Sequence, residues 1–345
     1  MMNRCLALSF AAALAVTSPA AKAEAPSYAI TRTIPLGAPD RWDYLTFDAP
    51  SGRLYISHGD RVTVVDGKSG AILGQVATLP GGTHGIAIVP MERGYTDDGR
   101  AGIVASFDPK SFAIIRRIKV ERDADGMLFD PSSGHVFVIE GDSAKITAID
   151  PKTDTAVATI DGGGGLEFGV SGDNGKIYVN GAEKNEIVRI DTATNKADAH
   201  WPMPGCQRPH GLAMDRVTHR LFSSCANKVL VVMNADNGAI VATLPIGAGT
   251  DAAAFDPKRN LVFSSNREGT LSVIAEKSPD SFVTLPPVKT EFGARTMAVD
   301  PESGRIYLVA AEFAQNPNAA ASDPRHRYVI TPGSVRLLFL DPLSH

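Results

Sequence analysis

A short pattern recurs along this chain at a nearly constant interval, and that interval constrains the fold more than any other feature. The clearest part of the pattern is an apolar residue followed by Asp, at Asp48, Asp130, Asp215, Asp256 and Asp300. The successive spacings are 82, 85, 41 and 44 residues. Each long spacing contains one weaker copy, at 88–90 and 170–172, so the chain holds seven units of about 41 to 44 residues.

Each unit contains four short runs of β-forming residues separated by Gly, Pro, Asp and Asn. The first run is small and apolar, the second has a central aromatic residue, such as Tyr55 or Tyr307, and the third is β-branched. This alternation of short runs and turn residues predicts antiparallel strands. No segment after the N-terminal apolar stretch has the 3.6-residue periodicity of an amphipathic helix.

Seven four-stranded units at this period predict an all-β fold, a seven-bladed β-propeller with four-stranded antiparallel blades. One such sheet cannot bury both of its faces, whereas sheets packed in a ring bury each face against a neighbour. The last unit ends with residues 335–341, which have the pattern of a third strand. Residues 28–37 resemble the fourth strand at 240–247, so we expect the N-terminal strand to complete the last blade and leave no open edge.

The first 23 residues have the organisation of a signal peptide. Arg4 supplies the positive charge, residues 5–16 form a short apolar stretch, and Ala21-Lys22-Ala23 fits a cleavage site. We therefore expect cleavage after Ala23, a single propeller domain over residues 24–345, and a periplasmic or secreted protein. The apolar stretch is too short to favour a membrane anchor.

The charge balance argues against nucleic acid as a partner. The 345 residues include 34 Lys and Arg against 38 Asp and Glu, a formal net charge of −4. Proteins that bind nucleic acid usually present a basic face. We expect a monomer that binds a small molecule or a protein and has no membrane partner.

Several segments resemble the repeats of the YVTN-repeat, YncE-like family of bacterial seven-bladed propellers, whose architecture is WD40-like. The matching segments are LFDP at 128–131, KIYVN at 176–180, IDTATNK at 190–196, VATLPIG at 241–247 and FSSN at 263–266. The resemblance extends over essentially the whole chain after residue 23 and implies the propeller fold. It implies no particular activity, and DNA binding, one trait of the family, does not fit the acidic balance of this chain.

The first strand of each propeller blade lines the central channel, and the residue that opens this strand faces the channel mouth. Counting back from the recurring Asp, with an adjustment in two irregular units, places an ionisable residue there in all seven units. These residues are Asp43, His84, Asp125, Glu167, His210, Asp251 and Arg295. We call them the channel ring and predict that they bind a ligand.

Each ring histidine lies between two ring carboxylates in blade order. His84 follows Asp43 and precedes Asp125, and His210 has the same placement in the other half of the ring. Flanking carboxylates are expected to raise the pKa of each imidazole. The candidate ligands of a divalent metal ion are His84, His210, Asp43 and Asp125. The two histidines belong to nearly opposite blades, however, and are too far apart to share one ion.

Three interpretations of the channel ring are open on sequence alone. It can be a solvated charged ring without a ligand, a site for a metal or another cation, or a site for an organic ligand with Arg295 as an anion clamp. The first corresponds to the ordinary solvation of carboxylates in a wet channel. No cofactor beyond a divalent metal ion is indicated.

Two cysteines follow the expected cleavage site. Cys206 precedes the first strand of the fifth unit and Cys225 ends its second strand. An up-and-down sheet brings both positions to the face that carries the ring, and an oxidising compartment favours a bond. We predict a Cys206–Cys225 disulfide.

Other features are expected on the same face. The turns between second and third strands emerge there, and some of their polar residues, such as Arg267, are candidate ligands. Trp42 is expected either to form an apolar wall of the site or to pack between the first and last blades. Residues 313–331 form an insertion longer than the other turns, either a lid or docking loop or a loose connection.

The sequence lacks the motifs of common catalytic sites. It has no Gly-x-Ser-x-Gly elbow, no Cys-x-x-Cys, and no Gly-Lys-Ser/Thr after its glycine run at 162–165. We therefore expect a ligand- or protein-binding scaffold that acts through the channel face. The alternative is a metal-assisted hydrolase or lactonase in which a ring carboxylate or histidine activates water.

Overall fold

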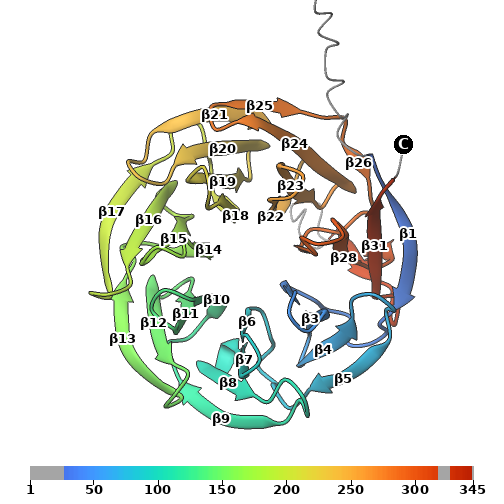
Figure 1. Ribbon diagram of the computed structural model, residues 1–345. Coiled ribbons are helices and arrows are strands. Elements are labelled where there is room, and N and C mark those ends of the chain that lie inside the picture. Colours follow the sequence, from blue (N-terminus) through green and yellow to red (C-terminus); the bar gives the residue numbers. More distant parts are fainter. Residues whose placement is uncertain (1–26, 318–326, 344–345) are drawn as a thin grey trace, which may run out of the picture.

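The computed structural model describes residues 27–317 and 327–343, and they form seven antiparallel sheets arranged as a ring (Figure 1). The predicted signal peptide and its cleavage site after Ala23 lie outside the described residues, as do residues 318–326 of the predicted insertion. The only helical segment described is one turn of 3-10 helix, η1 (Gly99–Ala101). No helix in the described ranges has the length and apolar character that a membrane span requires.

The first four blades each consist of four consecutive strands. They are β2 (Leu45–Asp48), β3 (Arg53–His58), β4 (Arg61–Asp66) and β5 (Ile72–Val76); β6 (Ile86–Val89), β7 (Arg93–Asp98), β8 (Ile103–Phe107) and β9 (Ile114–Lys119); β10 (Ala124–Asp130), β11 (His135–Glu140), β12 (Lys145–Asp150) and β13 (Thr155–Asp161); and β14 (Leu166–Ser171), β15 (Lys176–Gly181), β16 (Glu186–Asp191) and β17 (Lys196–Pro202).

The remaining three blades include two departures from this order. Blade 5 is β18 (Pro209–Asp215), β19 (Arg220–Cys225), β20 (Val229–Asn234) and β21 (Ile240–Pro245). Blade 6 is β22 (Thr250–Asp256), β23 (Leu261–Asn266), β24 (Thr270–Ser278) and β25 (Ser281–Thr284), with β26 (Val288–Lys289) also paired to β24. Blade 7 is β27 (Met297–Val299), β28 (Ile306–Ala310), β31 (Arg336–Pro342) and the N-terminal β1 (Tyr28–Pro35).

The N-terminal strand closes the ring, as the sequence predicts. β1 runs antiparallel to β31, with Tyr28 opposite Pro342 and Pro35 opposite Arg336. Blade 7 is therefore built from both ends of the described chain, and β1 pairs with the edge of β31 that would otherwise be open. The prediction of a seven-bladed propeller completed by its N-terminal strand is confirmed.

The hydrophobic core is divided among the contacts between neighbouring blades. The buried apolar side chains form seven clusters within the described residues, and each cluster joins two adjacent blades. Each second strand contributes one aromatic side chain that is at most 1% exposed: Tyr55, Tyr95, Phe137, Tyr178, Phe222, Phe263 and Tyr307. Since a blade buries its faces only against its neighbours, the ring is the stable unit.

The recurring Asp of each unit is explained by turn chemistry. At the end of the first strand its carboxylate accepts main-chain N–H groups of the following turn, such as Ser133 N to Asp130 (2.9 Å) and Glu302 N to Asp300 (2.9 Å). Asp is preferred at such a position because its short carboxylate reaches the N–H groups two and three residues onward. The sequence repeat therefore marks the turns on the face opposite the channel ring.

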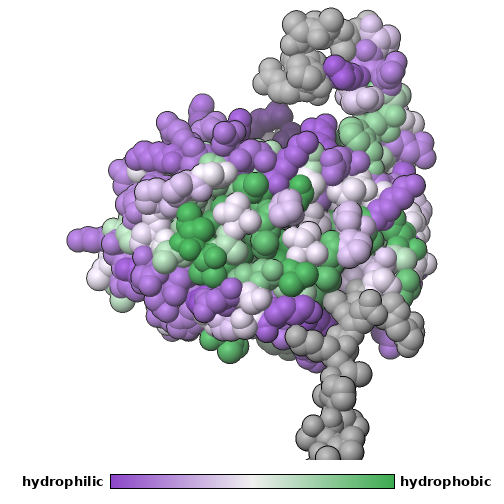
Figure 2. Space-filling model, turned by 90° about the horizontal axis from the view of Figure 1, so that it is seen from above, coloured by the Kyte–Doolittle hydropathy of each residue, from purple (hydrophilic) through white to green (hydrophobic). Residues whose placement is uncertain are grey.

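Seen from its edge, the disk carries a hydrophobic band on the rim between two hydrophilic faces (Figure 2). The insertion of blade 7 contains a short hairpin, β29 (Phe313–Gln315) and β30 (Tyr328–Ile330), which projects from one face as a stalk with hydrophobic residues on it (Figure 2). The described part of the insertion is thus a paired hairpin rather than a loose connection.

A buried carboxyl on β11 yields a prediction about stability. Glu140 is fully buried and accepts a hydrogen bond from the Thr147 hydroxyl (2.6 Å). Burial raises the pKa of Glu140 to about 7, whereas the ordinary value is 4.5. Between about pH 4.5 and pH 7, the folded protein therefore keeps a proton that the unfolded chain releases. The free energy of unfolding falls as the pH rises through this range.

The substitution Glu140→Gln removes this ionisation. The variant is expected to match the wild type in unfolding free energy near pH 4 and to exceed it by on the order of 3 kcal/mol at pH 8. Urea unfolding at several pH values measures the difference. A difference that stays constant from pH 5 to pH 8 would contradict the assigned pKa.

Candidate functional site

The seven channel-ring residues occupy equivalent places in the seven blades, and each is half-buried. In blades 3 to 6 the ring residue is the second residue of the first strand, and in blades 1, 2 and 7 it lies two residues before that strand. The side chains of His84, Glu167, His210, Asp251 and Arg295 are between 16% and 36% exposed. The structure thus brings together residues up to 252 positions apart in the sequence, and their role as ligand-binding residues stays a prediction.

Irregular strand pairing directs the ring residues. In blades 3 to 6 the register between first and second strands shifts at the ring residue, as between Ala124 and Gly126, which flank Asp125. A β-bulge of this kind leaves one residue without a cross-strand partner and turns its side chain. The bulge therefore aims Asp125 and its counterparts toward the channel instead of into a blade interface.

Hydrogen bonds from neighbouring blades hold the backbone of the ring. The ring carbonyls accept side-chain donors: Thr296 to Asp43 (2.8 Å), Ser57 to His84 (2.5 Å), Asn180 to His210 (2.8 Å) and Ser265 to Arg295. Each donor belongs to the blade that precedes the acceptor in the ring. The position of a ring residue is thus fixed by two blades at once.

Small residues after the ring histidines allow the blades to approach one another. A Cβ atom added to Gly85 would lie 2.3 Å from the carbonyl oxygen of Asp125, and one added to Gly211 would lie 2.2 Å from the nitrogen of Ala253. Such distances are far below ordinary contact, so only glycine fits. Each ring histidine is therefore followed by a close approach of two backbone segments.

One half of the ring contains a continuous set of charge contacts. Arg295 Nε lies 3.0 Å from Asp251, and His210 Nδ1 lies 3.7 Å from Asp251 and 3.5 Å from Glu167. The nearby Glu167 carboxylate raises the pKa of His210, although burial opposes the rise. Burial raises the pKa of Asp251, and the neighbouring Arg295 and His210 limit that rise.

In the other half, His84 is paired with a residue that the sequence analysis missed. The fully buried Asp97 on β7 accepts hydrogen bonds from the His84 main-chain nitrogen and from its ring Nδ1, both at 2.8 Å. Burial lowers the pKa of His84, but the carboxylates of Asp97, Asp43 and Asp125 outweigh it and raise the value to about 9. The available signal was an acidic pair, Asp97-Asp98, on a second strand where most units have apolar or small polar residues.

The carboxylates in this half are poorly compensated. Burial raises the pKa of Asp43 to about 6, with Asp251 adding to the rise and Arg295 and His84 opposing it. Burial also raises the pKa of Asp125 well above its ordinary value, and Asp43 adds to that rise. These shifts mean that the ionised forms of Asp43 and Asp125 are held at a cost in free energy.

An aromatic pair crosses the channel. Tyr44 of blade 1 and Phe168 of blade 4 each follow a ring residue, and their ring centroids are 5.0 Å apart. These blades lie on opposite sides of the ring (Figure 1). The pair therefore bridges the channel, and burial together with four ring carboxylates raises the pKa of Tyr44 well above its ordinary value. The sequence contained one sign of this pair, which is a large aromatic residue in two units at a position that is Gly, Ala or Thr in the other five.

Two pockets include ring residues. The first, of about 170 Å³, lies between blades 6, 7 and 1; we call it the arginine pocket. Its lining residues are Arg41, Trp42, Asp43, Arg267, Gly293, Arg295, Phe313 and Ile330. The second, of about 530 Å³, lies between blades 3, 4 and 5, and its charged lining residues are Asp123, Asp125, Asp142, Glu167, Glu183 and Arg208. The two pockets have opposite charge.

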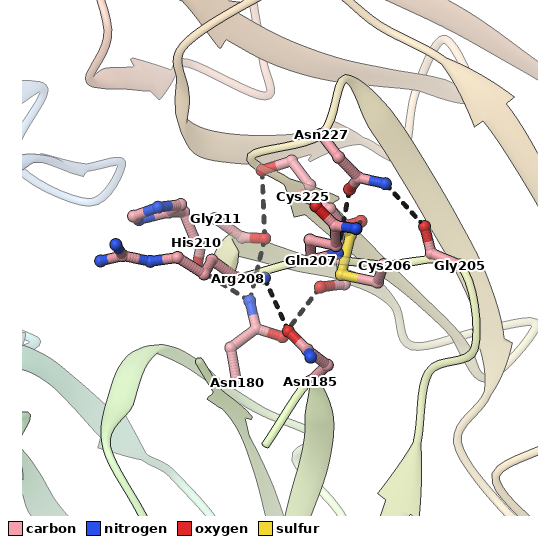
Figure 3. The surroundings of a disulfide bond; sticks show 12 residues. Asn180, Asn185, Gly205, Cys206, Gln207, Arg208, His210, Gly211, Cys225 and Asn227 are labelled. Carbon is pink, nitrogen blue, oxygen red and sulfur yellow. Dashed lines mark hydrogen bonds between the residues drawn. A yellow bond between two sulfur atoms is a disulfide. The ribbon is translucent and has the colours of Figure 1, made fainter. Parts of the chain in front are cut away.

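The predicted disulfide is confirmed. Cys206 and Cys225 are bonded, with their Cα atoms 5.5 Å apart, and both are buried. The bond fixes the segment that enters β18, and from this segment Arg208 and His210 extend together to the side away from the sulfur atoms (Figure 3). The N–H group of Arg208 donates to Asn185 (2.7 Å), which ties the segment to blade 4.

Trp42 fulfils both of its predicted roles. It is 6% exposed and packs among blade 1 and blade 7 side chains, while part of it lines the arginine pocket. Its ring also meets Phe313 of the hairpin edge-on, with centroids 6.5 Å apart. The insertion is thereby connected to the candidate site.

The candidate metal ligands do not converge. Within residues 27–317 and 327–343, no group of three or more His, Cys, Asp or Glu side chains is arranged to hold a metal ion. His84, His210, Asp43 and Asp125 instead pair with other protein groups or lie in separate parts of the ring. The donor arrangement therefore gives no support to the metal-assisted hydrolase alternative.

Solved structures share this fold at low sequence identity. A chain of Kuenenia stuttgartiensis hydrazine synthase superposes with a TM-score of 0.68 at 15% identity, over 77% of this chain and 91% of that chain. The RRP9 WD40 repeats superpose with a TM-score of 0.71 at 9% identity, over 92% of this chain and 99% of that chain. No family model and no curated protein sequence matches this chain. The likeness shows a WD40-like propeller and carries no information on activity.

Removal of the disulfide should destabilise the fold. The bond closes a loop with a sequence separation of 19, for which loop-closure entropy predicts a contribution of about 3 kcal/mol. The double variant Cys206→Ala, Cys225→Ala is expected to lose about this much unfolding free energy in urea. Reduction of the wild type should reproduce the loss and leave the double variant unchanged. Equal stability of oxidised and reduced wild type would contradict a stabilising role.

Proposed function

We propose that this protein is an exported propeller of the YVTN type that binds a small molecule at the channel ring. The observation that supports it best is the closed, one-sided shape of the site. The aromatic pair Tyr44–Phe168 bridges the channel, and the ring side chains and both pockets lie beside it. A channel blocked in this way is suited to holding a ligand at one face and not to letting a molecule pass through the ring.

The electrostatics of the ring favour a ligand over mere solvation. A freely solvated carboxylate keeps its ordinary pKa, whereas burial raises the pKa values of Asp43, Asp125 and Asp251. The protein thus holds these charges at a cost in free energy. Unrelieved charge of this kind is more frequent at functional sites than elsewhere.

Export rests on the signal-peptide pattern of residues 1–23 and is compatible with the disulfide. The volumes of the two pockets, about 170 Å³ and about 530 Å³, favour a small molecule as the primary ligand. A protein partner would add its contacts over the wider ring face, including the stalk formed by β29 and β30.

The proposal is tested by screening small organic anions, amines and neutral molecules for binding by ligand-observed NMR. Binders should be lost in the double variant Asp43→Asn, Arg295→Gln, which removes one negative and one positive charge from the ring. The matched control is Lys258→Gln, Glu302→Gln, which removes an ion pair (2.5 Å) from turns on the opposite face. The control should retain every binder.

Thermal unfolding verifies that both variants are folded. A screen in which no compound binds, or in which all binders survive the ring substitutions, would overturn the proposal. Binding of a protein to the ring face without any small-molecule binder would also count against it.

A further inference from the structure

The arginine pocket contains more positive than negative charge. Three guanidinium groups, those of Arg41, Arg267 and Arg295, line it together with the single carboxylate of Asp43. Of the three, Arg295 has an ion-pair partner, Asp251 at 3.0 Å. In the part of the chain that the structure describes, neither Arg41 nor Arg267 has a carboxylate within ion-pair distance, so neither cation is neutralised by a direct ion pair.

The surroundings of Arg41 also favour an anion. Its Nη2 atom lies 3.1 Å from Nε2 of His84, whose other ring nitrogen is held by Asp97. This contact with His84 holds the Arg41 side chain beside the pocket. The N–H groups of Arg41 that do not face His84 can donate charge-assisted hydrogen bonds to an anion there.

One part of the pocket lining, which we call the apolar wall, has a fixed position. Trp42, Phe313 and Ile330 form this wall. Phe313 packs edge-on against Phe292, with ring centroids 5.1 Å apart. A Cβ atom at Gly293, where φ is +90°, would lie 2.3 Å from the Phe313 ring, so this glycine allows the ring to rest on the backbone beside Arg295.

We propose, on the basis of the small-molecule function above, that the arginine pocket binds an organic carboxylate with a compact apolar or aromatic body. The carboxylate pairs with Arg295, Arg267 and Arg41, and the body lies against Phe313 and Trp42. A planar guanidinium matches a carboxylate with two parallel hydrogen bonds. At about 170 Å³ the pocket is smaller than the roughly 300–1,000 Å³ typical of drug-sized ligands, which limits the body to about one ring.

The apolar wall distinguishes this ligand class from inorganic anions. Phosphate or sulfate would meet the guanidinium groups but leave the aromatic wall in contact with water, which forfeits the free energy of burying it. A neutral aromatic molecule would use the wall but leave the arginines unpaired. The observations together require one molecule that carries both features.

The test uses benzoate, phenylacetate and 3-phenylpropionate as probes, with acetate, inorganic phosphate and the three corresponding amides as controls. Isothermal titration of the full chain measures each affinity at pH 7. At least one aromatic carboxylate should bind at least tenfold more tightly than acetate, phosphate and its own amide. Failure of all three aromatic carboxylates to exceed these controls would overturn the proposal.

Three variants divide the site into its parts. Arg295→Gln and Arg267→Gln should each weaken the bound carboxylate by tenfold or more, and Arg267 provides the second test because it has no ion pair whose loss could unfold the protein. Phe313→Ala should remove the advantage of the aromatic carboxylate over acetate without abolishing carboxylate binding. An unchanged affinity for the carboxylate in Arg267→Gln would contradict the pairing of the carboxylate with this arginine. An unchanged preference for the aromatic carboxylate over acetate in Phe313→Ala would contradict the role of the apolar wall.

The two proposals fail in different ways. If other compounds bind and are lost on substitution of Asp43 and Arg295 while no aromatic carboxylate binds, the ligand class is wrong and the small-molecule function stands. If nothing in either panel binds, both are wrong. The matched control on the opposite face, Lys258→Gln with Glu302→Gln, should leave the aromatic carboxylate affinity unchanged.

Discussion

The pairing of β1 with β31 is the contact on which the rest of the molecule depends. A four-stranded blade has two apolar faces and buries each only against a neighbour, so an open row of blades would expose one face at each end. The β1–β31 ladder joins the two ends of the described chain inside one sheet and thereby removes both exposed faces. Every blade interface then has the same character, and the inner strands meet around a common axis.

Closure also creates the chemistry of the site. Each blade contributes one half-buried ionisable side chain at its inner edge, and the ring geometry places the seven within electrostatic reach of one another. The raised pKa values of the ring carboxylates and the bridging aromatic pair follow from bringing seven equivalent positions together and excluding water from between them. In blades 3 to 6, the irregular pairing between the first and second strands turns the ring side chains toward the channel.

The fold and the ring positions could be predicted from the sequence because both follow from the repeat. The recurring Asp marks a turn that each blade needs, and counting back from it along a strand of known rise reaches the inner edge. Asp97 could not be found in this way, because it reaches His84 from a second strand through a pairing register that the repeat does not encode. Tyr44 and Phe168 contact each other across the channel, a relation that exists only once the ring has closed.

The arginine pocket also could not be predicted from the sequence repeat. Its residues come from two blade entries, one turn and one hairpin, which the sequence analysis placed on a common face without showing that they adjoin. Trp42 illustrates the reason. From the sequence, packing between blades and lining the site were alternatives, whereas in the structure one side of the ring packs between blades 1 and 7 and another part lines the pocket. Positions that obey the repeat are predictable, whereas positions that depart from it become interpretable only through their neighbours.

The most direct test of this account is the titration of the Asp43 carboxyl by ¹³C NMR in the wild type and in Arg295→Gln. Burial raises the pKa of Asp43 to about 6, and Arg295 of blade 7 limits the rise. The predicted result is therefore a midpoint near pH 6 that moves upward when Arg295 is replaced. A midpoint at the ordinary Asp value, unchanged by the substitution, would show that these residues do not share one closed ring.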